Sequence, residues 1–327
     1  MEQVEADSLR QILQAQYSQL KRNKALRPTS HGLMALAIDG HEIQASYRRQ
    51  CEGNLERRVK TRHGWRTQYY HRHVTAMLLC ADYPLLLDAE MLRPGDSELS
   101  AARRLLERVL VAYPRAFDIV LGDALYSDTQ IYQLLVSHGK DILSVLKKNQ
   151  LDLLVNAEAL MEQTEPILDH DDGKTWQQVH DITGFDPWPG LEKPLRVVRS
   201  LEGHQVRRQI DGQHEELLSQ WLWVTTCTPH RASHQAVVAL GHARWDIENR
   251  GFNETVNRWH IDHVYKHSTN AILTFWLMAM LAFNFFYTFY HRNLKPALQA
   301  KISCQHIARC LASELHVRRI WPQPQPP

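Results

Sequence analysis

Two aspartates follow short apolar runs, a pattern that puts a carboxylate at the end of a buried strand. Asp39 follows residues 33–38, and Asp123 follows residues 117–121 after one glycine. Functional groups gather at the carboxyl ends of strands in α/β sheets. If these two strands are neighbours, the carboxylates can share Mg²⁺ ions, which are held by few carboxylates together with water and phosphate oxygens. Either aspartate alone is equally well explained as a turn or helix-capping residue.

A third acidic partner is expected in the helical segment 244–254. On a helix, Arg244 and Glu248 lie on one face, because they are four residues apart. The same spacing also describes an ordinary surface ion pair, worth about 0.2–0.5 kcal/mol. Periodicity alone does not choose between Glu248 and its neighbours Asp246 and Glu254.

The apolar periodicity around these acids predicts an α/β fold with a mixed sheet flanked by helices. Strands are expected at residues 33–38, 42–47, 73–80, 84–89, 117–121, 141–146, 195–200 and 221–226. Helices are expected at residues 1–27, 97–113, 127–138, 232–259 and 271–290, and in the first part of 150–172, ahead of an acidic loop. A tight turn at Asp39 and Gly40 is expected to join the first two strands.

This order of elements divides the chain into five segments. Residues 174–226 are rich in Val, Trp, Thr and turn residues, which predicts a β-rich insertion before the helix with the third acidic residue. The segments are a short N-terminal helical segment (1–32), the first part of the core (33–150), the β-rich insertion (151–230), the remainder of the core (231–295) and a C-terminal tail (296–327).

Residues 46–72 concentrate positive charge and aromatic rings. The basic residues are Arg48, Arg49, Arg57, Arg58, Lys60, Arg62, Arg66 and Arg72, and Tyr47, Trp65, Tyr69 and Tyr70 lie between them. One interpretation is a solvated loop. The other is a surface that contacts phosphates and stacks on bases.

The bulk composition is that of an ordinary folded protein, with 44% hydrophobic and 23% charged residues. The net charge of +2 does not by itself indicate a partner. Five scattered cysteines suit a reducing compartment, and the acidic first residues lack the pattern of a secretion signal. Cys304, His306 and Cys310 are metal-ligand types, but no second cluster completes a zinc site, so ordinary buried thiols are expected.

Residues 271–290 carry no formal charge and are long enough to cross a bilayer. A fully buried helix of a large core has the same composition. The rest of the chain is polar, so a buried helix is expected and membrane association is not.

Four stretches, in this order, resemble the DDE (Asp, Asp, Glu) transposases of bacterial insertion sequences, which have a ribonuclease H-like core. The resemblance covers about residues 36–290. The first two stretches contain the aspartates, the second in a D-x-x-Y pattern; the last contains R-x3-E. The stretches are residues 37–40, 117–126, 146–150 and 244–253.

This resemblance implies that Asp39, Asp123 and Glu248 are the catalytic residues and the ligands of Mg²⁺, for which Mn²⁺ can substitute. The implied activity is metal-dependent cleavage and transfer of DNA strands at insertion-sequence ends, by a homodimer bound to transposon ends and target DNA, without a small-molecule cofactor. We expect a cytoplasmic protein, associated with the nucleoid when bound to DNA. The expected DNA contacts are Arg48, Arg49, Tyr126, Lys147, Lys148 and Arg244.

The insertion is also interpreted through the resemblance. In the branch of the family that makes hairpin-ended intermediates, an insertion at this place holds the transposon end. Its tryptophans are candidates for stacking on a displaced base, although any one of them is more often a core residue. These candidates are Trp176, Trp188, Trp221 and Trp223.

The sequence departs from the family pattern at three places. Gly241 stands where the family has a Tyr, and no Lys follows Glu248 at residues 254–257, although Arg250 or Arg258 is available to contact phosphate. Only about 30 residues precede the core, where many relatives have a DNA-binding region. The alternative function is therefore a folded but inactive, N-terminally shortened remnant that only binds DNA.

Overall fold

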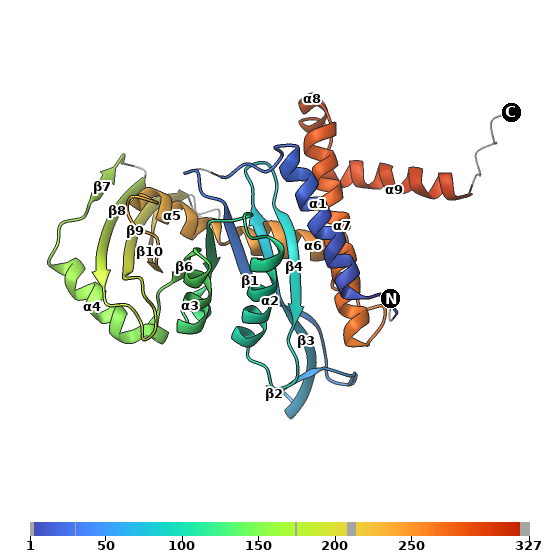
Figure 1. Ribbon diagram of the computed structural model, residues 1–327, viewed down its shortest axis with the longest axis horizontal. Coiled ribbons are helices and arrows are strands. Elements are labelled where there is room, and N and C mark those ends of the chain that lie inside the picture. The colour runs from blue at the N-terminus through green and yellow to red at the C-terminus, as the bar shows by residue number, and fades with distance from the viewer. Residues whose placement is uncertain (1–2, 30, 174, 208–213, 321–327) are drawn as a thin grey trace.

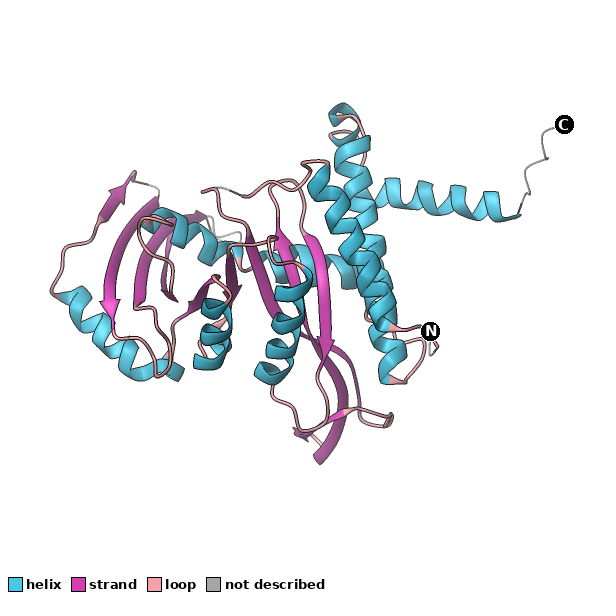
Figure 2. Ribbon diagram, in the orientation of Figure 1, coloured by secondary structure: helices cyan, strands magenta, loops and turns pink. Residues whose placement is uncertain are grey.

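The computed structural model describes residues 3–29, 31–173, 175–207 and 214–320. Within them the strands form one ten-stranded sheet in the order β2-β3-β1-β5-β6-β10-β9-β8-β7, with β4 paired to β3. Figure 2 shows helices on both sides of it. The strands are β1 (Ala35–Ser46), β2 (Leu55–Thr61), β3 (Gly64–Leu79), β4 (Leu85–Met91), β5 (Ile119–Gly122), β6 (Asp141–Val145), β7 (Leu168–Asp171), β8 (Thr175–Phe185), β9 (Leu195–Arg207) and β10 (His214–Thr225).

The helices cover the sheet in two layers. The α-helices are α1 (Ala6–Arg22), α2 (Glu98–Ala112), α3 (Thr129–Ser137), α4 (Leu151–Glu162), α5 (His234–Ala243), α6 (Asn253–Trp259), α7 (Thr269–Asn293), α8 (Pro296–Gln299) and α9 (Cys304–Ile320). Three short helices complete the list: the 3₁₀ turns η1 (Ala124–Tyr126) and η2 (Lys148–Gln150) and the π-helix η3 (Ile247–Phe252). One core cluster contains side chains of α2, α3 and α4. The other contains those of α5, η3 and α7.

The strand order confirms the expected mixed sheet flanked by helices. β1 is antiparallel to β3, and β3 to β4, whereas β1, β5 and β6 run parallel. This arrangement is consistent with the ribonuclease H-like core that the resemblance implies. Along β1, Leu36 and Ile38 join one core cluster while Ala35 and Ala37 join the other, as the period of two in a strand requires.

The predicted turn at Asp39 and Gly40 is wrong, because β1 runs through both residues as one strand. β3 pairs with β1 from Ala35 to Ser46 and satisfies the backbone on both sides of the expected turn. An irregularity lies further on, between Ile43 and Ala45, where Gln44 has a positive φ of 48°. An aspartate followed by glycine resembles a hairpin turn locally, but the long partner strand decides the conformation.

The β-rich insertion is present and is continuous with the core sheet. Strands β8, β9 and β10 pair with one another, and β10 also pairs with β6 over Trp223–Thr225. Strands were expected at 195–200 and 221–226, and both extend further, while β8 was not expected. Asp169 and Asp171, expected in a loop, lie in the edge strand β7.

The expected helix 232–259 is divided into α5, the π-helix η3 and α6. Hydrophobic periodicity does not resolve such a change, because α and π turns bury nearly the same face. The π turn contains Glu248, and η3 packs on the buried strand β1. π turns inside helices often occur at functional sites.

The apolar segment 271–290 belongs to the core helix α7. α7 is long and apolar enough to cross a membrane by composition, but half of its most apolar window is buried in the molecule, so it is weak evidence for a membrane span. Its Asn284 exchanges hydrogen bonds of 2.9 and 2.8 Å with the backbone N–H and carbonyl of Leu86. A third hydrogen bond of Asn284, donated to the Gln16 side chain, ties α7 to α1. The buried-helix interpretation fits these contacts.

The segment 296–327, expected as a tail, contains α8 and α9, and α9 extends away from the body (Figure 1). The proline-rich residues 322–327 lie outside the described residues. Cys310 is exposed and Cys304 half-buried, so the expectation of buried thiols is wrong there.

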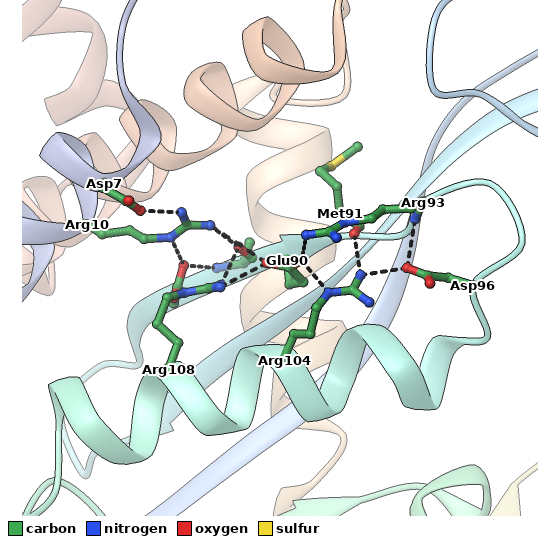
Figure 3. Close-up of polar contacts among 10 residues, drawn as sticks. Asp7, Arg10, Glu90, Met91, Arg93, Asp96, Arg104 and Arg108 are labelled. Atoms are coloured by element: carbon green, nitrogen blue, oxygen red, sulfur yellow. Dashed lines mark hydrogen bonds and ion pairs between the residues drawn. The ribbon is translucent and has the colours of Figure 1, made fainter.

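A network of ion pairs joins α1, β4 and α2 (Figure 3). The carboxylates of Asp88 and Glu90 are almost fully buried on β4. Arg108 donates to Asp88 at 2.5 Å and to Glu90 at 2.9 Å. Arg10 donates to Asp88 at 2.9 Å, and Arg104 donates to Glu90 at 2.8 Å. Because buried charges without partners are costly, these arginines fix both helices on the strand.

We therefore expect Arg108→Met to lower the free energy of unfolding by about 3 kcal/mol, since it leaves buried carboxylates undercompensated. The matched control is Arg103→Met on the same helix, where the arginine is half-exposed, with an expected effect below about 1 kcal/mol. Urea denaturation measures both. Equal losses for the two variants would contradict a structural role for the network.

Candidate active site

Asp39 and Asp123 lie on neighbouring parallel strands, the condition under which their carboxylates can act together. β1 pairs with β5 only from Ala35 to Ala37, so Asp39 lies just beyond the last paired residue. Asp123 directly follows β5, where its side chain caps η1 by accepting from Leu125 N at 2.8 Å. The Asp39 carboxylate accepts from Gly40 N at 2.8 Å.

Glu248 reaches the same place from η3 through a shared arginine. Nη1 of Arg244 lies 3.0 Å from a carboxylate oxygen of Glu248 and 3.6 Å from one of Asp39. Arg244 is buried, and its guanidinium also lies over the ring of Trp245. The expectation that Arg244 and Glu248 share a helix face is confirmed.

The other two acids that periodicity left open have different partners. Asp246 pairs with Arg250 at 3.3 Å. Glu254 pairs with Arg258 at 2.9 Å and accepts a hydrogen bond from Tyr287. Glu248 is thus the acid of this segment that meets Asp39 through Arg244.

Burial and the neighbouring charges shift the pKa of Asp39. Its side chain is 15% exposed, and burial raises its pKa from 3.8 to about 7. The hydrogen bond from Gly40 and the charge of Arg244 oppose this rise, while the charges of Asp123 and Glu248 add to it. At neutral pH, Asp39 is therefore partly protonated in the metal-free protein, and a cation that binds it has to displace this proton.

The three carboxylates do not form a complete metal site by themselves. Among the residues that the structure describes, no three His, Cys, Asp or Glu side chains lie close enough together to hold a metal ion. Arg244 stands between Asp39 and Glu248 and offsets their charge. The donor set is nevertheless made of carboxylate oxygens, which Mg²⁺ prefers.

Glu98, at the start of α2, belongs to this neighbourhood, and the sequence reasoning missed it. Its carboxylate accepts from the Tyr126 hydroxyl at 2.8 Å and pairs with Arg72 at 2.6 Å. A methyl group at Gly40 would overlap this carboxylate, so Gly40 is needed for close approach rather than for a turn. In the sequence, a glutamate in the first turn of a helix is explained by its favourable interaction with the helix dipole, so nothing marks Glu98 as a site residue. The Gly40 contact is the only signal, and it is visible only in three dimensions.

Two of the expected DNA contacts are buried instead. Tyr126 is fully buried, and its hydroxyl points to Glu98. Arg244 is occupied by the two carboxylates described above. Both residues support the acids from inside the protein, so the prediction that they contact DNA directly needs correction.

The other four expected contacts are exposed. Lys147 and Lys148 follow β6, in a turn tied to the segment after Asp123. The tie is a hydrogen bond of 2.6 Å from Asn149 to the Ala124 carbonyl. Arg48 and Arg49 follow β1, and Arg49 lies 2.6 Å from a ring nitrogen of His267.

Trp223 explains one departure from the family pattern. Its buried indole presses on α5 at Gly241, where any side chain would overlap it. A Tyr at position 241 is therefore incompatible with Trp223, which is a core residue. Trp188 packs edge-on against buried Tyr132 with 4.7 Å between ring centroids, and Trp221 stacks on Trp223. Trp176 lies against Gly203 within the insertion.

Comparison with known proteins identifies a family. A family model described as "Transposase DDE domain" matches residues 30–285. Among solved structures, the chain is similar to the NurA nuclease from Sulfolobus solfataricus, with 14% sequence identity, 97% of this chain and 94% of that chain covered, and a TM-score of 0.30. A likeness of that size carries no argument about function. No curated protein matches the chain.

The raised pKa of Asp39 makes stability depend on pH in a defined direction. The folded-state pKa is about 7 and the ordinary value is 3.8, so the unfolded chain loses its proton first as pH rises. In metal-free buffer this group destabilises the fold increasingly from about pH 4 to about pH 7. The Asp39→Asn variant has no carboxylate to titrate here. Its free energy of unfolding, relative to that of the parent, should therefore rise by on the order of 1–4 kcal/mol across that range.

Urea denaturation with EDTA at a series of pH values measures this difference. The control is Asp246→Asn, which removes a carboxylate that pairs with Arg250 and not with Arg244. This variant should leave the dependence of stability on pH unchanged. A constant difference between parent and Asp39→Asn across the range would show that Asp39 is not desolvated as described.

Proposed function

Because this chain belongs to the family of transposase DDE domains, we propose that it cuts and joins DNA strands with the help of divalent metal ions. The observation that supports the proposal is that Asp39 and Glu248 share one buried arginine, while Asp123 follows the strand next to that of Asp39. Burial, together with the charges of Asp123 and Glu248, raises the pKa of Asp39. Arg244 contacts two of the three acids.

We assign Asp39, Asp123 and Glu248 as catalytic residues and as ligands of Mg²⁺, with Mn²⁺ as a substitute of similar ligand preference. Phosphate oxygens of the DNA and waters would complete the coordination. When bound, two such ions supply an activated attacking oxygen and stabilise the leaving oxygen of an in-line displacement.

The chain's own side chains set the orientation of these acids. Arg244 keeps Glu248 and Asp39 directed to one point and offsets their charge. The Glu98 carboxylate, fixed by Arg72 and Tyr126, lies against Gly40 and restrains the backbone next to Asp39. Because Asp39 must give up its proton to bind a cation, affinity for Mg²⁺ should rise between about pH 6 and about pH 8.

The exposed cations Lys147, Lys148, Arg48 and Arg49 are proposed as phosphate contacts. Contacts of this kind fix the register of a protein on DNA but carry no sequence information. Lys147 and Lys148 are best supported, because their turn is tied to the segment that follows Asp123. The partners would be transposon ends and target DNA.

Strand transfer requires two DNA ends to be held together, so we propose that the chain acts as a homodimer on DNA. A DNA-acting protein of this kind would work in the cytoplasm, on the nucleoid. The competing proposal is a folded relative that binds DNA without cutting it. Two observations favour that alternative: residues 254–257, where the family has a Lys, contain none, and the nearby Arg258 is paired with Glu254.

The deciding experiment is a nicking assay on supercoiled DNA with Mg²⁺, Mn²⁺ or EDTA. We expect cleavage by the parent only with metal. Asp123→Asn and Glu248→Gln should each reduce the rate by about 10³-fold or more, as losses in a cooperating catalytic set do. These substitutions keep the shape of the side chain and remove the charge.

Asp246→Asn is the matched control, two residues from Glu248, and should cut within about threefold of the parent rate. DNA binding is measured in parallel with Ca²⁺. Binding without cleavage by a folded parent would favour the binding-only alternative. Cleavage that survives both substitutions would refute the assignment of the three acids.

A further inference from the structure

The outer part of the β2–β3 hairpin extends beyond the body of the molecule as a two-stranded arm. We define the arm as residues 55–70. Figure 1 shows it projecting from the lower end of the sheet, away from the helices. β2 pairs with β3 alone, from Leu55↔Tyr70 to Thr61↔Gly64. The part of β3 from Gly64 to Gln68 has no partner in β1.

The arm is strongly cationic. Its basic residues are Arg57, Arg58, Lys60, Arg62 and Arg66, and its only carboxylate is Glu56. Arg57 pairs with Glu42, outside the arm. The other four cations are exposed. Across the described ranges, none of these four makes an ion pair with a carboxylate.

Positive charge lies on both faces of the arm. The register pairs Lys60 with Trp65 and Val59 with Arg66, and side chains alternate between faces along each strand. Arg58 and Lys60 therefore share a face with Trp65, and Arg57 shares the opposite face with Arg66. A ribbon that lies flat on an anionic surface needs charge on one face only. A ribbon inserted between two phosphate backbones needs it on both.

Exposed aromatic rings hold the guanidinium groups in place. Arg58 lies over the ring of Trp65 at 5.8 Å, and Arg66 lies over Tyr47 at 5.0 Å. Trp65 is 61% exposed, next to the turn of the hairpin. An exposed ring among cations offers a face on which a base can stack beside the positive charge.

The arm is joined rigidly to the candidate active site. β3 continues from Trp65 to Thr75, which pairs with Asp39. Ten residues of strand at roughly 3.3 Å each span about 33 Å. This length is close to one turn of B-form DNA, about 34 Å.

We propose that the arm enters the major groove of duplex DNA about one helical turn from the phosphodiester that is cleaved at the site of the three acids. The major groove is about 12 Å wide and admits a two-stranded ribbon, whereas that of duplex RNA is too deep and narrow. The spacing rests on the proposed function, but the groove contact does not.

The arm variant Arg58→Gln/Lys60→Gln/Arg66→Gln tests the contact. The control Arg292→Gln/Lys301→Gln/Arg309→Gln removes equal charge from exposed positions in the C-terminal part of the chain. We measure affinity for a 30-base-pair duplex in Ca²⁺ from low to moderate salt. The arm variant should bind at least about tenfold more weakly, with a salt slope reduced by about two to three.

The control variant should stay within about threefold of the parent. Duplex RNA of the same length should bind parent and arm variant alike, and N7-methylation of every guanine should weaken the parent more than the arm variant. Equal weakening by both triple variants, or an equal arm effect on duplex RNA, would overturn the proposal in favour of non-specific charge.

A photo-crosslinking amino acid in place of Trp65 tests the spacing. Crosslinks should map about ten base pairs from the nick on the same duplex, and crosslinks beside the nick would overturn the spacing. If the parent does not nick, the proposed function fails, while the salt and groove measurements still decide whether the arm binds DNA.

Discussion

The candidate active site depends on one partly buried carboxylate in a central strand, that of Asp39. Asp39 lies on β1, which pairs with β3 at this residue and with β5 on the other side only as far as Ala37. Arg244 must be buried beside it, and the π turn that follows directs Glu248 to the same guanidinium. Gly40 must remain without a side chain because Glu98 lies against it. Arg244, Glu248 and the glycine at position 40 are thus all linked to the surroundings of this carboxylate.

The sequence predicted the parts of this site that depend on local pattern. Apolar runs that end at an aspartate pointed to Asp39 and Asp123, because a buried strand can be recognised from its apolar composition. Glu248 could not be chosen from periodicity, because Asp246 and Glu254 fit equally well, and only the resemblance selected it. The structure separates them by their partners: Arg250 for Asp246, and Arg258 for Glu254.

What the sequence did not predict depends on contacts between distant residues. Glu98 resembles an ordinary first-turn glutamate, because its meeting with Gly40 is made by folding. Tyr126 was predicted to contact DNA, but its hydroxyl donates a hydrogen bond to Glu98 inside the protein. Asp39 and Gly40 form a convincing turn signal, and only the long β3 strand overrides it. The extent of the basic hairpin likewise follows from pairing rather than from charge.

The hydrogen bonds between β6 and β10 limit which segments of the chain can be deleted. Because β10 is hydrogen-bonded to β6, the insertion cannot be removed without breaking strand pairs of the core sheet. Deleting it would leave β6 as an unpaired edge strand of the central sheet, which could pair with a second molecule. A shortened, soluble descendant of this protein would have to keep β10, or blunt that edge with charge or proline. Structurally, β10 therefore belongs to the core sheet as much as to the insertion.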